Sequence, residues 1–102
     1  MKAVRFSSAA KTELDDAVEA YEIVAPGVGV AFRLVVESAN ADIAGNLLSY
    51  ARYPGTLCHQ CVLPKRFPYS VIYLETPTII RIIAVAHHSR RPGYWKKRLR
   101  RP

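Results

Sequence analysis

The chain has 102 residues, half of them hydrophobic, and carries 15 Lys and Arg against eight Asp and Glu, a net charge of +7. This length suits one compact domain and is too short for two of ordinary size. No uninterrupted run of about eighteen apolar residues is present, which argues against a membrane-spanning segment. We therefore expect a single domain over residues 1–102, and, because the chain does not start like a secretory signal, a cytoplasmic location.

The charges are distributed unevenly along the chain. Residues 1–51 contain four basic and seven acidic residues, a net charge of −3, whereas residues 52–102 contain eleven basic residues and one acidic residue, Glu75, a net charge of +10. This polarity predicts a mildly acidic helical part and a positive surface that attracts nucleic acid or an acidic protein. A surface that is merely solubilising is the alternative.

The two cysteines, Cys58 and Cys61, form a C-x-x-C motif around His59. A closed zinc site needs four ligands, and although His87 and His88 would complete such a set, no second pair with zinc-finger spacing is present. The motif also lacks the strand-then-helix context of a thioredoxin-type redox site. We therefore expect no metal and no cofactor, and two free cysteines that pack as small apolar residues.

The first half of the chain predicts a short strand and two helices. Residues 2–6 alternate polar and apolar side chains, and Ser7-Ser8 offers a hydroxyl cap for a following helix. Two stretches with apolar residues at spacings of three and four are separated by Pro26-Gly27. Their apolar stripes are Ala10, Leu14, Ala17, Tyr21 and Val24, then Val28, Phe32, Val35, Ala39 and Ile43. This pattern predicts an antiparallel helical hairpin packed on a sheet.

The second half predicts three strands, over residues 57–63, 69–75 and 78–86, after a turn signal at 53–55. The short connection Thr76-Pro77 favours an antiparallel meander. Strict alternation in the last strand predicts one face with Ile80, Ile82, Ala84 and Ala86, under the helices, and another with Ile79, Arg81, Ile83, Val85 and His87. The basic tail, residues 89–102, is expected to form an arm or a short terminal helix. The predicted fold class is therefore α+β, with the strands forming one sheet.

Three motifs resemble those of the RelE/ParE superfamily of bacterial toxins, which includes plasmid stabilisation proteins. Residues 66–73, RFPYSVIY, are similar to the family pattern RFPY-x-x-x-Y. Residues 82–98, IIAVAHHSRRPGYWKKR, resemble the close I-x-A-V-x-H-x-x-R-x-P-x-Y-W-x-x-R of many ParE-like members. Residues 26–29, PGVG, followed by Phe32, are similar to the PGLG-x-x-F segment between the helices. The resemblance extends over nearly the whole chain and implies the same order of elements.

The resemblance implies the toxin of a type II toxin–antitoxin pair, which inhibits bacterial growth and is neutralised by an acidic antitoxin in a hetero-oligomer. Family members either block DNA gyrase or cleave messenger RNA on the ribosome. The ParE-like closing motif favours gyrase, and a ribosome-dependent mRNA endoribonuclease, or mRNA interferase, is the alternative. An antitoxin of this kind is expected to wrap over the helical hairpin and the open face of the sheet.

A ribonuclease needs cations around the scissile phosphate and a side chain that moves a proton. The catalytic residues under that alternative are Arg81, His87, His88, Arg90 and Tyr94. RelE-type nucleases place basic residues on the first meander strand and an arginine after the aromatic of the second, whereas this chain has Cys61, Val62 and Leu63, then Ser70. The resemblance to the nucleases is therefore incomplete, and an RNA-binding module without catalysis, or a decayed toxin, stays open.

Basic and aromatic residues outside the catalytic set are candidates for contact with the target or with nucleic acid. Trp95 either stacks on a base or anchors the tail to the sheet. Tyr69 and Tyr73, four residues apart on one strand face, are assigned to packing. The predicted binding residues are Lys65, Arg66, Arg91, Trp95, Lys96, Lys97 and Arg98.

Overall fold

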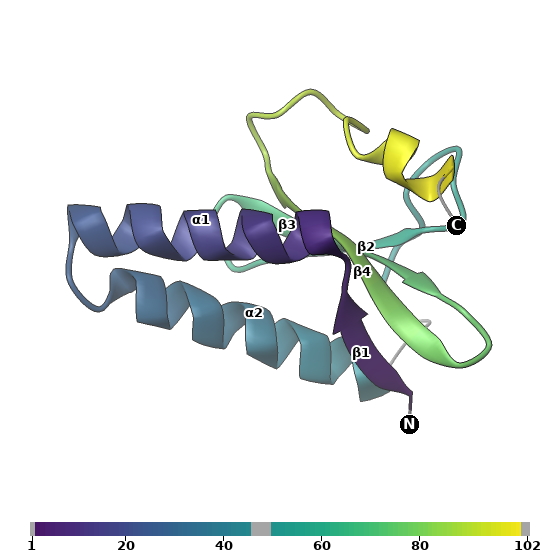
Figure 1. Cartoon of the computed structure of the whole chain (residues 1–102), viewed down its shortest axis with the longest axis horizontal. Helices are drawn as coiled ribbons and strands as arrows, with labels where there is room; N and C mark the ends of the chain where they lie inside the picture. The colour runs from purple at the N-terminus through teal and green to yellow at the C-terminus, as the bar shows by residue number, and fades with distance from the viewer. Residues whose placement is uncertain (1, 46–49, 101–102) are drawn as a thin grey trace.

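The computed structural model describes residues 2–45 and 50–100. A helical hairpin covers one face of a four-stranded sheet, and the C-terminal segment lies against the other face (Figure 1). The elements in chain order are β1 (Ala3–Phe6), α1 (Ser8–Val24), α2 (Val28–Gly45), β2 (His59–Val62), β3 (Tyr69–Glu75), β4 (Ile79–His87) and the 3-10 helix η2 (Lys96–Arg100). The predicted α+β arrangement is therefore confirmed, including the short terminal helix.

The sheet has the strand order β1-β4-β3-β2. The strands β2, β3 and β4 form the predicted antiparallel meander, and β1 lies parallel to β4 at the sheet edge. The first meander strand starts at His59 rather than at Leu57, because residues 53–58 form a turn closed by the Tyr53 N–H donating to the Cys58 carbonyl at 2.8 Å. No helix within the described ranges is long and apolar enough to cross a membrane.

Ser7 starts the first helix as predicted, since its hydroxyl accepts a hydrogen bond from the Ala10 N–H at 3.1 Å. The hairpin turn depends on Gly27, whose φ of 90° lies in the left-handed region that glycine adopts without strain. The Glu22 carboxylate accepts hydrogen bonds from the N–H groups of Gly27 and Val30 at 3.0 Å. It thereby satisfies two backbone donors at the start of α2.

The main core lies between the hairpin and the sheet. Most residues of the two predicted stripes are in it, and Tyr73 and Tyr69 pack there as assigned. One stripe position is wrong. Val24 is 83% exposed because it is the last residue of α1. In α2 the half-buried Val35 packs against the core, and its neighbour Val36 is fully buried.

The alternation predicted for the last strand fails after Ile82 because β4 contains a bulge. Ile72 pairs with Ala84 but Tyr73 pairs with Ile82, so Ile83 has no opposite residue on β3. Ile83 and Ala84 consequently face the same side, and every later residue changes face.

Four predicted orientations are therefore wrong. Ala84 and Ala86 face away from the helices, whereas Val85 packs under them, and the His87 ring lies edge-on to Tyr69 on that same side at 4.9 Å. Arg81 and His87 consequently occupy opposite faces.

A second, smaller core lies on the far face of the sheet. It contains Ile72, Ile83, Cys58 and Trp95, with Leu99 packed against it. The basic tail is thus no free arm in its described part, residues 89–100, since two of its apolar side chains hold it to the sheet; Arg101 and Pro102 lie outside the described residues. Part of the sheet face expected to be open for an antitoxin is covered by the tail.

Candidate functional site

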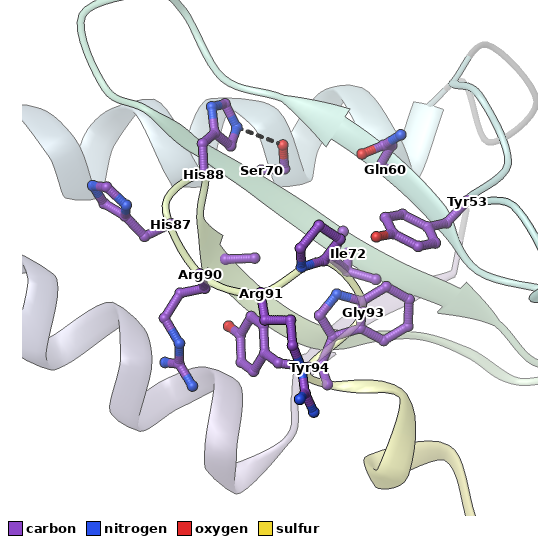
Figure 2. Close-up of a pocket in the computed structure, with 13 residues that line it drawn as sticks. Tyr53, Gln60, Ser70, Ile72, His87, His88, Arg90, Arg91, Gly93 and Tyr94 are labelled. Carbon is purple, nitrogen blue, oxygen red and sulfur yellow. Dashed lines mark hydrogen bonds between the residues drawn. The ribbon is translucent and has the colours of Figure 1, made fainter.

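A cavity of about 200 Å³ opens where the ends of β3 and β4 meet the loop of residues 88–95 (Figure 2). Ser70 and Ile72 contribute from β3, Gln60 from β2 and Tyr53 from the turn before it. Six residues of the predicted sets also line the cavity: His87, His88, Arg90, Arg91, Tyr94 and Trp95. The closing motif therefore folds back on the RFPY strand to form one hollow lined by basic, aromatic and aliphatic side chains.

Two histidines at the end of β4 have different partners. The His88 Nε2 atom lies 2.9 Å from the Ser70 hydroxyl, which is 5% exposed and sits on the floor of the cavity (Figure 2). The His87 Nδ1 atom accepts the Ser89 N–H at 3.0 Å, so the neutral His87 ring carries its proton on Nε2. His87 also lines a second hollow against α1, with Asp16. The His88 ring therefore contacts Ser70 in the first cavity, whereas the His87 ring lies towards α1.

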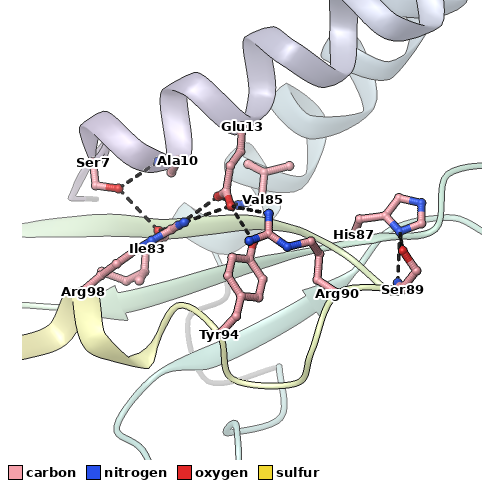
Figure 3. A network of polar contacts seen from close by, with 10 residues as sticks. All are labelled: Ser7, Ala10, Glu13, Ile83, Val85, His87, Ser89, Arg90, Tyr94 and Arg98. Atoms are coloured by element: carbon pink, nitrogen blue, oxygen red, sulfur yellow. Dashed lines mark hydrogen bonds and ion pairs between the residues drawn. The ribbon is translucent and has the colours of Figure 1, made fainter.

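Glu13 of α1 is the centre of a polar network that joins the helix to the sheet and the tail (Figure 3). Its carboxylate accepts hydrogen bonds from the Arg98 Nη1 and Nη2 atoms at 2.9 and 3.0 Å, from the Tyr94 hydroxyl, and from the Val85 N–H at 3.1 Å. The Arg90 guanidinium lies 3.9 Å from the same carboxylate and 3.9 Å from the centre of the Tyr94 ring. One carboxylate therefore positions three residues of the predicted site.

The network changes what Tyr94 and Arg98 are able to do. Burial, together with the hydrogen bond to Glu13, raises the pKa of the Tyr94 phenol well above its ordinary value, so this hydroxyl remains a hydrogen-bond donor. The hydrogen bonds to Glu13 raise the pKa of the Arg98 guanidinium, whose charge is compensated. Neither side chain presents a free proton acceptor or a free positive charge to the cavity.

Sequence reasoning did not single out Glu13. A signal was present, because Glu13 lies three residues after Ala10 and four before Ala17, on the border of the buried stripe of α1. An acidic residue at such a position needs a partner, and here the partners come from the other end of the chain.

Trp95 lines the cavity but is part of the second core, and the remaining predicted residues lie away from the cavity. Trp95 is 1% exposed and its ring packs edge-on against Tyr53 at 4.8 Å, so it anchors the tail. Lys65 and Arg66 are exposed in the loop between β2 and β3, with Arg66 over the Phe67 ring. Lys96 and Lys97 are exposed on η2. Arg81 lies six residues before His87 along β4, about 20 Å away for an extended strand, and does not line the cavity.

The cysteines are buried on opposite faces of the sheet, Cys58 in the second core and Cys61 in the main core. Burial raises the pKa of both thiols, which keeps them protonated. No group of three or more potential metal ligands occurs in the described parts of the chain. Both cysteines therefore pack as small apolar residues, as predicted.

Comparison with known proteins gives a structural likeness only. No family model matches the chain, and no curated protein matches it. Among solved structures, a chain of "Chromosomal ParDE TA system from P. aeruginosa" is similar, with a TM-score of 0.72 and 18% sequence identity over 85% of this chain and 96% of that chain. The protein therefore has a ParE-like fold, as the resemblance in its motifs implies.

Proposed function

We propose that this protein is the toxin of a type II toxin–antitoxin pair, that it blocks DNA gyrase in the bacterial cytoplasm, and that a cognate acidic antitoxin silences it. The likeness to a chain of a ParDE toxin–antitoxin system over 85% of the sequence supports the class. The three ParE-like motifs form the hairpin turn, the entry and body of β3, and β4 with the tail, which supports the proposal.

The choice of gyrase rests on the state of Tyr94. A general base has to release and accept protons near neutral pH, whereas this phenol is held by Glu13 and its pKa is raised. Arg81, a second member of the predicted nuclease set, is remote from the cavity. The arrangement favours a toxin that acts by binding over one that cleaves RNA.

A ribosome-dependent mRNA endoribonuclease is the second candidate, and one observation favours it. His87, His88, Arg90 and Arg91 line one cavity, with a serine hydroxyl 2.9 Å from His88. A histidine able to move a proton beside two guanidinium groups suits chemistry at a phosphodiester.

The experiment compares the parent with the double variant His87→Ala/His88→Ala in two assays. Purified protein is added to gyrase with relaxed plasmid, and growing bacteria that express the protein are pulse-labelled for DNA and protein synthesis. We expect inhibition of supercoiling and an early loss of DNA synthesis, both little changed by the double variant. His59→Gln, at the one histidine outside the cavity, serves as the matched control.

Early loss of translation that only the double variant relieves would establish the ribonuclease and exclude gyrase as the target. Unimpaired growth with the parent would contradict the proposed toxin and leave the decayed toxin or the plain binding module.

The antitoxin is tested by co-expressing this chain with a small acidic protein encoded by an adjacent gene. We expect it to co-purify with this chain in a hetero-oligomer and to restore growth. Failure to restore growth despite equal expression would contradict the assignment of that protein as the partner.

A further inference from the structure

Arg5 of β1 and Arg81 of β4 lie directly beside each other in the sheet, since their Cα atoms are register partners. Their neighbours Val4 and Ile80 pack in the core under the helices. Successive side chains of a strand point to opposite faces, so both arginines point to the face that the helices leave uncovered. Neighbouring strands lie about 4.8 Å apart, which places the two side-chain bases close together.

The sheet face opposite the helices carries no acidic residue among those the structure describes. Seven of the eight acidic residues belong to α1 and α2, on the other side of the sheet. The eighth, Glu75, pairs in register with Ile80, whose side chain faces the helices, and its carboxylate binds Lys2. Neither Arg5 nor Arg81 takes part in an ion pair within the described ranges.

Like charges on adjacent strand positions repel and destabilise a sheet. The usual compensation, a nearby carboxylate, is missing, and Leu74 is the residue beside Arg81 on β3. Arg5 is exposed and Arg81 half-exposed, so solvent and ligands reach both. An external anion is the group that would relieve the repulsion.

The tail extends this positive surface. Its side chains Trp95 and Leu99 pack on the same face, near Ile83 and Leu74, and the Arg98 Nη1 atom donates to the Ile83 carbonyl at 3.0 Å. η2 is therefore fixed to β4 at Ile83, two residues along the strand from Arg81. It adds the exposed bases Lys96, Lys97 and Arg100.

The surface suits nucleic acid better than a protein partner. An acidic peptide that binds stably needs an apolar anchor, and the large exposed hydrophobic residues lie on the helical hairpin or near β2: Ile23, Val24, Val30, Leu34, Leu57 and Val62. Trp95 is buried and Tyr94 is tied to Glu13, so neither offers a platform for unpaired bases. The surface therefore offers only positive charges, which bind phosphate groups without recognising the base sequence.

We propose that Arg5 and Arg81, with the exposed bases of η2, bind the phosphate backbone of duplex DNA without sequence preference. The site is separate from the cavity lined by His87 and His88. Guanidinium groups release counterions from DNA, so binding weakens steeply with salt.

The test measures fluorescence anisotropy of a labelled duplex of about 20 base pairs, long enough for one footprint, over a series of salt concentrations. We expect Arg5→Gln/Arg81→Gln to lower the slope of log affinity against log salt by about 2, and to weaken binding about tenfold for each arginine near 0.1 M salt. Lys11→Gln/Arg33→Gln is the control, with the same charge change. Lys11 lies on α1 and Arg33 on α2, in the helical layer on the other side of the sheet.

Thermal unfolding of the same variants separates binding from folding. Removing both of the repelling arginines is expected to leave the melting temperature unchanged or to raise it, whereas a structural role would lower it. Equal loss of DNA affinity in the control would overturn the proposal, because net charge alone would then explain binding. It would also be overturned if Arg5→Gln/Arg81→Gln weakened binding to poly-glutamate but not to DNA. The assay needs neither gyrase nor growth inhibition, so its outcome is independent of the proposed toxin activity.

Discussion

At the scale of single residues, Glu13 joins the two ends of the chain. It links the first helix to Tyr94 and Arg98, which lie 81 and 85 residues away along the chain. Both ends of the ion pair are mostly shielded from water, with side chains 14% and 21% exposed, so the interaction is stronger than an ordinary surface pair. Together with the packing of Trp95, this carboxylate holds the loop of residues 88–95 in place at the edge of the cavity.

The variant Glu13→Gln keeps the size of the side chain and removes its charge. We expect the free energy of unfolding to fall by about 2–3 kcal/mol, because Arg98 is left without its counter-charge in a partly buried place. Urea unfolding followed by the fluorescence of Trp95, the single tryptophan, measures the change. Glu19→Gln, an exposed position on the same helix, should change stability by less than about 0.5 kcal/mol. Equal effects of the two variants would contradict the role given to Glu13.

At the scale of elements, Gly29 lies where α2 packs tightly against α1. A Cβ atom there would lie 2.3 Å from the Val18 carbonyl oxygen, a backbone atom that cannot move aside. The PGVG segment therefore does more than make a turn. Its second glycine sets the distance between α1 and α2, and with it the width of the layer that covers the sheet.

Alanine substitutions at two glycines of α2 should have opposite effects. Gly29→Ala is expected to destabilise the protein by about 1–3 kcal/mol, because the helices must separate. Gly45→Ala, where nothing lies within 4 Å of the added atom, should be neutral or stabilise by up to about 1 kcal/mol through its better helix propensity. Thermal unfolding of both variants checks this. A loss of stability at Gly45 that matches the loss at Gly29 would show that helix separation is not the cause.

The strand β4 marks the limit of pattern reading at this scale. Its apolar residues predict a central strand, and it is central, with β1 and β3 on either side. The bulge at Ile83 has no such signal, because residues on both sides of it are apolar and either face can accept them. Packing against β3 and the tail decides which residues of β4 point to the helices. The alternation of the sequence therefore predicts the wrong face for His87.

At the scale of the whole molecule, charge is divided between two layers. The helices carry seven of the eight acidic residues, while the face with Arg5, Arg81 and the tail is basic. The division in sequence between the two halves of the chain thus becomes a division in space, with β1 as the exception, since it carries Arg5 from the acidic half into the basic face.

The protein should lose stability in alkali. Burial raises the pKa of five tyrosines: Tyr21, Tyr50, Tyr69, Tyr73 and Tyr94. A phenol whose pKa is higher in the folded chain than its ordinary value near 10 stabilises the fold fully below pH 10. This stabilisation is lost as the pH rises through the folded pKa, which for Tyr73 is about 12.

Urea midpoints at pH 8, 10.5 and 11.5 measure this loss. We expect a steady fall above pH 10, and a shallower fall for Tyr73→Phe because that variant has one phenol fewer to titrate. The comparison uses the slope with pH, so a constant offset from the lost hydroxyl does not affect it. Identical slopes for the parent and Tyr73→Phe would show that Tyr73 titrates alike in both states.

The sequence by itself determined the order of the elements, the helical hairpin with its Ser7 cap and Gly27 turn, the burial of both cysteines, and six residues of the cavity. These depend on local spacing, on backbone preferences and on motifs that lie close together in the chain.

Only the tertiary structure decided the placement of β1 beside β4, the bulge at Ile83, the partners of Glu13 and the pairing of Arg5 with Arg81. Each of these joins residues that are distant in sequence, or turns a strand over, and the side chains on their own are compatible with more than one arrangement. Packing of the complete sheet between the hairpin and the tail selects one, because the two cores must be filled at the same time.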